Sequence, residues 1–88
     1  MVSKTLTIIN KLGLHARASA KLVQLANTYQ SQITIEKDGH KANAKSLMTV
    51  MMLAANIGST VTLTADGNDE IVAIEGLTNL IQNKFGEE

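Results

Sequence analysis

The sequence predicts an α+β fold in which three helices pack on one face of a four-stranded antiparallel sheet, in the order β-α-β-β-α-β-α. Three segments alternate between aliphatic and polar residues, which is typical of strands with one buried and one solvated face. Other segments place apolar residues at helical spacing. One-sided strands and amphipathic helices cover each other's apolar faces, so we expect all helices on the same side of the sheet. The 88 residues fit a single domain over 1–88.

The N-terminal half contains the predicted β-α-β-β part. Aliphatic and hydroxyl residues alternate at its start, an alanine-rich stretch with helical spacing follows, and Asp38-Gly39 is a strong hairpin signal. In chain order we predict a strand over Val2–Ile8, a loop over Asn10–Gly13, a helix from Ala16 to about Tyr29, and strands over Gln32–Lys37 and His40–Ala44.

The C-terminal half is predicted to hold a short helix, a strand and a longer helix. Ser46 can cap the short helix, which is expected to run to about Ala55, with Val50, Leu53 and Ala54 facing the sheet. Thr60–Asp66 alternates as the clearest strand of the chain. A turn follows, and then Asn68, Asp69 and Glu70 supply a cap and an acidic first turn for the last helix. Its apolar positions are Ile71, Ile74, Leu77, Leu80, Ile81 and Phe85.

Composition argues against several classes of function. Eight basic and eight acidic residues give zero net charge, and aromatic residues make up 2% of the chain, so an RNA-binding α/β domain or any other nucleic-acid binder is disfavoured. The chain has no Cys, no P-loop and no dinucleotide fingerprint, and we expect neither a metal nor a cofactor. The longest apolar stretch, Val50–Ala55, is too short to span a membrane, and no signal peptide is evident. A cytoplasmic, monomeric protein is expected.

The stretch Gly13-Leu14-His15-Ala16-Arg17 is the strongest candidate for chemistry. A glycine permits an unusual turn, and a histidine then stands where a helix begins. Free N–H groups and a partial positive charge make that helix end an anion site, and Arg17 can add a contact to phosphate oxygens. The alternative is that His15 only caps the helix and Arg17 is a solvated charge. His40 has no helix end beside it and is interpreted as an ordinary surface histidine.

A second candidate feature is the short helix after Ser46, which is apolar nearly all round. Only one side can be buried in a domain this thin, so Leu47, Met48 and Met51 are expected to form an exposed patch for protein partners. The alternative is a deeply buried helix whose methionines fill gaps. A further hypothesis is a binding module without enzymatic activity that recruits partners through this patch and carries no phosphate on His15.

Taken together, the two stretches resemble the HPr family of phosphocarrier proteins of the phosphotransferase system. Gly13–Arg17 is similar to the family's active-site signature, and Lys45-Ser46-Leu47-Met48 is similar to its regulatory-serine segment. The resemblance covers essentially the whole chain and implies an open-faced β-sandwich. It also implies that Enzyme I, which draws the group from phosphoenolpyruvate, phosphorylates His15 at Nδ1. The phosphoryl group then passes to a IIA domain, so the protein is a stoichiometric carrier and not an enzyme that turns over substrate.

Two points of the resemblance concern regulation. HPr proteins commonly have Pro after the Arg, whereas Ala18 stands here, and this variant is more similar to the nitrogen-branch paralogue NPr and to some HPr proteins. Since a first-turn Pro lacks an N–H, Ala18 restores one, and phosphate holding should survive. A role in sugar uptake and a role in nitrogen or carbon regulation both stay open. For Ser46 the resemblance implies phosphorylation by an HPr kinase/phosphorylase, beside the role as an N-cap.

Overall fold

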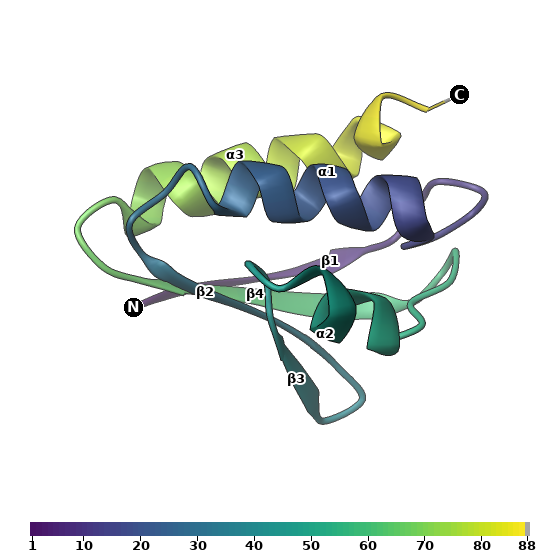
Figure 1. Cartoon of the computed structure of the whole chain (residues 1–88), viewed down its shortest axis with the longest axis horizontal. Coiled ribbons are helices and arrows are strands. Elements are labelled where there is room, and N and C mark those ends of the chain that lie inside the picture. The colour runs from purple at the N-terminus through teal and green to yellow at the C-terminus, as the bar shows by residue number, and fades with distance from the viewer. Residues whose placement is uncertain (88) are drawn as a thin grey trace.

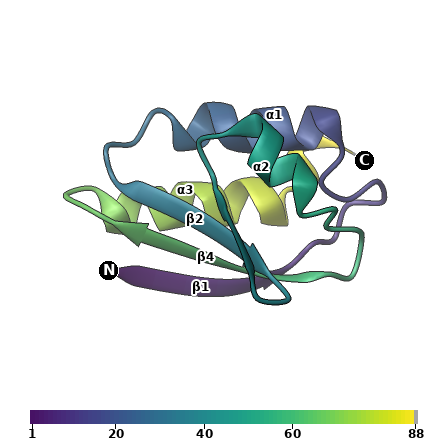
Figure 2. The ribbon, with the colours of Figure 1, turned by 60° about the horizontal axis from the view of Figure 1, so that its bottom comes forward.

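The computed structural model describes residues 1–87 and has the predicted order of elements. Four strands form one antiparallel sheet in the order β1-β4-β2-β3, and the helices lie on the same side of it (Figure 1 and Figure 2). The strands are β1 (Val2–Thr7), β2 (Gln32–Lys37), β3 (His40–Asn43) and β4 (Thr60–Asp66). The helices are α1 (Ala16–Ala26), α2 (Leu47–Met52) and α3 (Glu70–Gln82), followed by a 3-10 turn, η1 (Lys84–Gly86).

The alternation in the sequence sets the two faces of the sheet. Leu6 of β1 pairs with Val61 of β4, and both are buried under the helices. On the opposite face, the Ser3 and Thr64 hydroxyls lie 2.9 Å apart, and those of Thr5 and Thr62 lie 3.2 Å apart. The threonine face therefore stays solvated while the aliphatic face supplies the core. The largest buried side chains of that core are Phe85, Ile8, Leu22, Ile33, Ile35, Leu63, Leu77 and Ile81.

Four expectations for the helices are corrected by the structure. Helix α2 ends at Met52 and not near Ala55, because Ala54 takes a positive φ of 52° that a right-handed helix does not allow. Val50 and Leu53 are buried as predicted, but Ala54 is exposed. Tyr29 lies beyond the end of α1, and its hydroxyl packs against Gly76 of α3. Ile71, in the first turn of α3, is exposed and does not belong to the core.

The chain after α3 forms a C-terminal hook, Lys84–Glu87, instead of continuing the helix to Phe85 as expected. Lys84 and Phe85 both have φ of 57°, a left-handed conformation that costs roughly 1–2 kcal/mol for each residue with a side chain. Complete burial of Phe85 contributes about 1.5–3 kcal/mol in return. The Lys21 ammonium also donates a hydrogen bond of 2.6 Å to the Phe85 carbonyl. Core packing therefore holds the hook in a conformation that the local sequence does not favour.

Asp69 joins the loop before β2 to the start of α3. It stands at the N-cap of α3, as predicted, but its side chain makes no capping bond to that helix. The carboxylate instead accepts hydrogen bonds from the Gln30 N–H (2.8 Å), the Ser31 N–H (2.9 Å) and the Ser31 hydroxyl. The Ser31 hydroxyl bond, followed by the Gln30 bond, lowers the pKa of the Asp69 carboxyl, because both stabilise its ionised form.

This cross-link predicts a measurable dependence of stability on pH. Since the pKa of Asp69 is lowered by folding, its contribution is complete above the ordinary carboxyl pKa of 3.8 and is lost as the pH falls through the lower folded value. In urea unfolding at a series of pH values, Asp69→Asn should be less stable than the wild type at neutral pH. The difference should narrow below about pH 4. Asp38→Asn, at an exposed turn, serves as the control, and a constant gap for Asp69→Asn down to pH 2 would contradict the cross-link.

Candidate functional site

The backbone before α1 is fixed by a close contact with the segment after α2. Gly13 has φ of +66°, and a Cβ atom at this position would lie 2.5 Å from the Ala55 carbonyl oxygen. The Leu14 N–H donates a hydrogen bond of 2.8 Å to that same oxygen. A glycine is therefore required by both its conformation and its surroundings, and the predicted turn before His15 is confirmed.

His15 is the N-cap residue of α1, with extended backbone angles. Its carbonyl accepts the first bond of the helix, 2.8 Å from the Ser19 N–H, and the buried Ser19 hydroxyl donates 3.0 Å back to the Leu14 carbonyl. The ring nitrogen Nδ1 lies 3.3 Å from the Arg17 N–H and accepts from it. The side chain is 27% exposed, so the ring is held against the helix end and still open to solvent.

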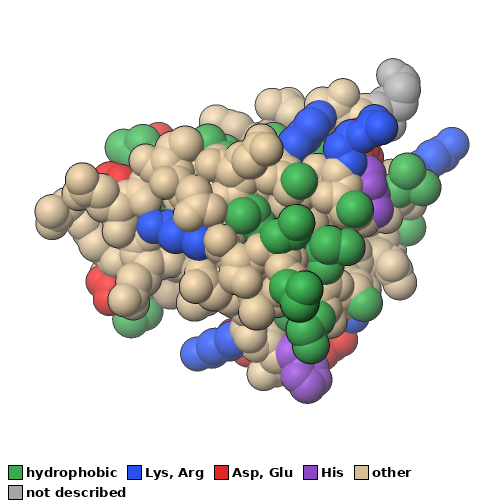
Figure 3. All heavy atoms as spheres, in the orientation of Figure 1, with side chains coloured by type: hydrophobic (Ala, Val, Ile, Leu, Met, Phe, Trp, Pro, Cys, Tyr) green, Lys and Arg blue, Asp and Glu red, His purple; other side chains and the backbone are tan. Residues whose placement is uncertain are grey.

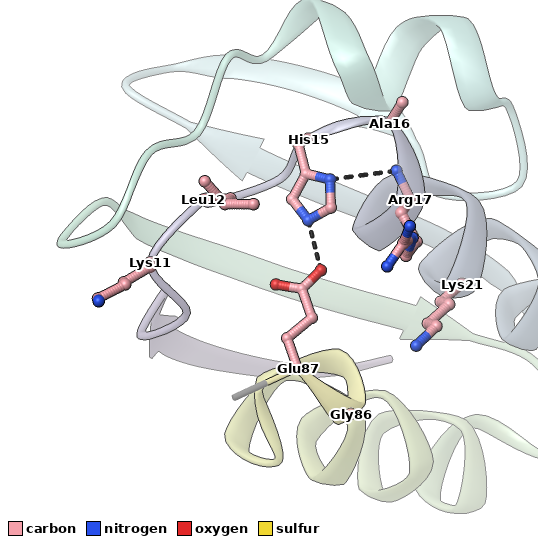
Figure 4. A pocket seen from close by; sticks show the side chains of 8 residues that line it. All are labelled: Lys11, Leu12, His15, Ala16, Arg17, Lys21, Gly86 and Glu87. Carbon is pink, nitrogen blue, oxygen red and sulfur yellow. Dashed lines mark hydrogen bonds and ion pairs between the residues drawn. The ribbon is translucent and has the colours of Figure 1, made fainter.

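The other ring nitrogen of His15 contacts the C-terminal hook. Nε2 forms a hydrogen bond with the Glu87 carboxylate, at the dashed line in Figure 4. The fully buried Asn10 donates from Nδ2 to Glu87 Oε1 at 3.0 Å and to the Gly13 carbonyl at 2.8 Å. An ionised carboxylate only accepts hydrogen bonds, so the neutral ring carries its proton on Nε2 and keeps a lone pair on Nδ1. A nucleophilic nitrogen thus faces the N-terminus of α1.

A shallow hollow opens beside the ring. It is lined by Lys11, Leu12, His15, Ala16, Arg17, Lys21, Gly86 and Glu87. In Figure 4, Arg17 and Lys21 extend from α1 on one side of Glu87, while Lys11 lies on the other side. Three cations and one carboxylate therefore border the hollow, and a dianionic group at Nδ1 would meet a positive field as well as the helix N–H groups.

The outer face of α2 is an exposed apolar patch, which we name the α2 patch and define as Leu47, Met48, Met51 and Met52. Met48 is 73% exposed, and Leu47 and Met51 are about 40% exposed, as predicted for the first three residues. Met52, which is 77% exposed, also belongs to the patch, although the predicted patch contained only Leu47, Met48 and Met51. Figure 3 shows hydrophobic side chains gathered over α2 and extending toward basic side chains at one end of the molecule. The alternative of a deeply buried helix is wrong for this face.

Ser46 and His40 lie outside the group around His15. Ser46 occupies the N-cap position of α2, but the predicted side-chain cap is absent, and the Thr49 hydroxyl instead donates to the Ser46 carbonyl at 3.1 Å. The Ser46 hydroxyl is therefore not committed to the helix. His40 begins β3 at the hairpin turn, is exposed, and fits the interpretation of a surface histidine.

The sequence analysis did not identify Asn10 and Glu87 as site residues. Asn10 bonds to the Gly13 carbonyl, and Glu87 bonds to the His15 ring. Asn10 was assigned to a loop without a role, and Glu87 is separated from His15 by 72 positions. No periodicity or spacing signals such a contact, because it depends on how the hook folds back over Phe85. No group of three potential metal ligands occurs within residues 1–87.

The family model for the HPr component of the phosphotransferase system, described by its phosphorylation site, matches residues 2–83. The chain belongs to the HPr family. It is 60% identical to the phosphocarrier protein HPr of Cupriavidus necator over 87 residues, covering 99% of this chain and 98% of the relative. HPr of Thermoanaerobacter tengcongensis matches with a TM-score of 0.97 and 51% identity, covering 100% and 99% of the two chains.

These HPr relatives confirm the resemblance and the fold predicted from the sequence, an open-faced antiparallel sheet with helices on one side. The chain is thus placed in the phosphocarrier family of the phosphotransferase system. An HPr dimer from Thermoanaerobacter tengcongensis also matches, with a TM-score of 0.80, 50% identity and coverage of 99% and 100%. That this chain is a monomer therefore stays a prediction. Within residues 1–87, no helix is long and apolar enough to cross a membrane.

The close approach at Gly13 predicts a large effect of adding one methyl group. Gly13→Ala combines a left-handed φ with a clash against backbone, so we expect a loss of about 2–4 kcal/mol in the free energy of unfolding. Gly39→Ala is the matched control, since φ is +82° but nothing lies within 4 Å of the added Cβ. That control should cost about 1–2 kcal/mol, the conformational term alone. Equal losses in denaturant unfolding would show that the contact with Ala55 has no role.

Proposed function

We propose that His15 carries the phosphoryl group, accepting it from Enzyme I and passing it to a IIA domain. The observation that supports this most directly is the orientation of the ring: Nδ1 faces the Arg17 N–H at the start of α1, inside a hollow bordered by cations. A nucleophilic nitrogen and an anion site then share one location. The carrier is stoichiometric, and its output is sugar uptake or nitrogen and carbon regulation.

This geometry supports a direct transfer between two histidines. The Nδ1 lone pair attacks the phosphorus atom held on the donor's own histidine, an N–P bond forms at Nδ1, and the donor's N–P bond breaks with its electron pair. N–H groups of the first turn and the Arg17 guanidinium hold the phosphoryl oxygens while charge is redistributed. In the second transfer the Nδ1–P bond breaks, its electron pair returns to the ring, and the acceptor takes the phosphoryl group.

The α2 patch is the proposed docking surface for both partners. The segment following α2 is hydrogen-bonded to Leu14, the residue before His15, so the patch and the ring have a fixed relation to one another. Each partner must bring its histidine in line with the same phosphorus atom, and one shared surface satisfies that requirement. Exposed methionines suit contact with several partners, because their side chains adapt in shape.

Ser46 is the proposed regulatory position. Its hydroxyl makes no capping bond, and Leu47 and Met48 follow it directly at the edge of the patch. A phosphoserine there, made by an HPr kinase/phosphorylase, places roughly two negative charges beside an apolar surface that must lose its water on docking. Phosphorylation at Ser46 would therefore weaken partner binding from outside the His15 site.

The first functional prediction concerns His15 and Arg17. With Enzyme I and phosphoenolpyruvate, His15→Ala should take up no acid-labile phosphate, as measured by mass spectrometry and phosphorus NMR, and its circular dichroism spectrum should be unchanged. Arg17→Ala should slow uptake by about tenfold without abolishing it, because the backbone N–H groups remain. His40→Ala is the control and should take up phosphate at the wild-type rate. Phosphate on His40 in the wild-type protein would refute the assignment to His15.

The second prediction concerns docking. Met48→Asp should weaken binding to Enzyme I and to a IIA domain by about tenfold each. In each complex, a side chain that docking buries would carry a charge that has lost its water. Met48 is 73% exposed, so the free energy of unfolding should change little. Ile71→Asp is the control, since Ile71 is an exposed aliphatic residue at the start of α3. Chemical-shift mapping that placed both partners on the threonine face of the sheet would contradict the docking surface.

The third prediction concerns Ser46. Ser46→Asp should slow phosphate transfer from Enzyme I to His15 several-fold while the fold stays stable, since no capping bond is lost. Ser46→Ala removes the hydroxyl without adding charge and should transfer at the wild-type rate. Its cost in unfolding free energy should stay within about 0.5 kcal/mol, below that of a true cap. Unchanged transfer by Ser46→Asp, together with no labelling of Ser46 by a cognate kinase, would remove the regulatory role.

A further inference from the structure

The carboxylate of Glu87 links the His15 ring to the buried side chain of Asn10. It bridges two N–H donors: Oε1 accepts from the Asn10 amide at 3.0 Å, and Oε2 bonds to His15 Nε2. Asn10 is fully buried and is itself held by the Gly13 carbonyl, so one end of the bridge is rigid. Figure 4 shows the Glu87 side chain reaching from the hook directly to the ring.

The contacts of the C-terminal hook hold Glu87 beside the His15 ring. Phe85 is buried in the core, and the Lys21 ammonium of α1 holds its carbonyl at 2.6 Å. The Glu87 N–H closes the turn by donating 2.9 Å to the Lys84 carbonyl. The hook residues, Lys84–Glu87, lie beyond residue 83, where the match to the family model ends.

We infer that Glu87 is a positioning residue for phosphoryl transfer, which keeps the proton of His15 on Nε2 and balances the charge of the ring. The inference rests on the proposed function of His15. With Nε2–H bonded to the carboxylate, the lone pair stays on Nδ1, where the Arg17 N–H and the basic hollow lie. The two contacts of the ring therefore favour the same tautomer.

The carboxylate also matters during the transfer itself. When the Nδ1 lone pair forms the bond to phosphorus, the ring keeps its Nε2 proton and becomes formally cationic. Glu87 then faces a positive ring across a charge-assisted hydrogen bond. When the Nδ1–P bond breaks, the electron pair returns to Nδ1 and the ring is neutral again. The proton stays on Nε2 throughout, and Glu87 accepts its hydrogen bond in both states.

The charge on Glu87 is secured by its surroundings. The hydrogen bond from Asn10 lowers the pKa of the Glu87 carboxyl, and the contact with His15 adds to this, although partial burial opposes it. Lys21, Arg17 and Lys11 border the same hollow, so the carboxylate is the one acidic side chain among its lining residues. An ionised acceptor is thus present at neutral pH.

Glu87→Gln is the sharpest test, because an amide has one acceptor oxygen where the carboxylate has two. The buried Asn10 donor requires that oxygen, which leaves the Gln NH₂ facing Nε2 and favours the tautomer with the proton on Nδ1. We expect the ¹⁵N chemical shifts of the neutral ring to report Nε2–H in the wild type and a several-fold larger share of Nδ1–H in the variant. Phosphate uptake should slow by about tenfold.

The controls separate this role from a structural one. Glu75→Gln, an exposed substitution on α3, should change neither readout. Glu87→Ala removes the acceptor and should lose the slowly exchanging Nε2–H proton signal while circular dichroism stays unchanged. Unchanged ¹⁵N shifts in Glu87→Gln, or shifted tautomers with wild-type uptake, would overturn the positioning role. If the wild type takes up no phosphate, the proposed function fails, while the ¹⁵N shifts still decide whether Glu87 sets the ring proton.

Discussion

The contact between the Gly13–Leu14 backbone and Ala55 fixes His15 relative to the segment that follows α2. It joins the entry to α1 with the exit from α2 through one hydrogen bond of 2.8 Å and one approach that admits only glycine. Because of this contact, His15, the N-cap of α1, lies close to the segment that follows α2. Without this join, the helix N-terminus and the apolar patch would be two unrelated surface features. With it, the entry to α1 and the segment after α2 lie against each other.

The strands and the position of His15 could be predicted from the sequence, because each depends on local chemistry. The alternation in Thr60–Asp66 and Gln32–Lys37 reports burial on one side only, and both strands have the predicted bounds. The turn at Gly13 and the helix start at Ala16 also follow from residue types that are neighbours in the chain. Where adjacent residues determine an element or a turn, the sequence pattern was sufficient to predict it.

The errors lie where tertiary contacts override local preference. Ser46 and Asp69 are residue types that favour helix N-caps, and both stand at that position, yet neither side chain caps. The Asp69 carboxylate instead accepts hydrogen bonds from the N–H groups of Gln30 and Ser31, in the loop before β2. Helical spacing likewise included Phe85 in the last helix, whereas burial of its ring turns the chain into the hook. Glu87 could not be found at all, since its contact with His15 exists only after that turn.

A phosphoryl carrier must bind its group firmly enough to receive it and weakly enough to give it away. The site around His15 meets both demands, given the proposed role of the ring. Its anion-binding elements are backbone N–H groups and side chains at an open hollow, with the ring 27% exposed, so solvent and partners reach the group from outside. A deep pocket with buried cations would hold the phosphoryl group more tightly, and it would then raise the barrier to the second transfer. The ring's other nitrogen, Nε2, contacts Glu87, which Asn10 holds in turn, so this contact lies away from the proposed phosphoryl group. For the proposed carrier, a held Nε2 and an open Nδ1 would let one histidine serve as acceptor and donor in turn.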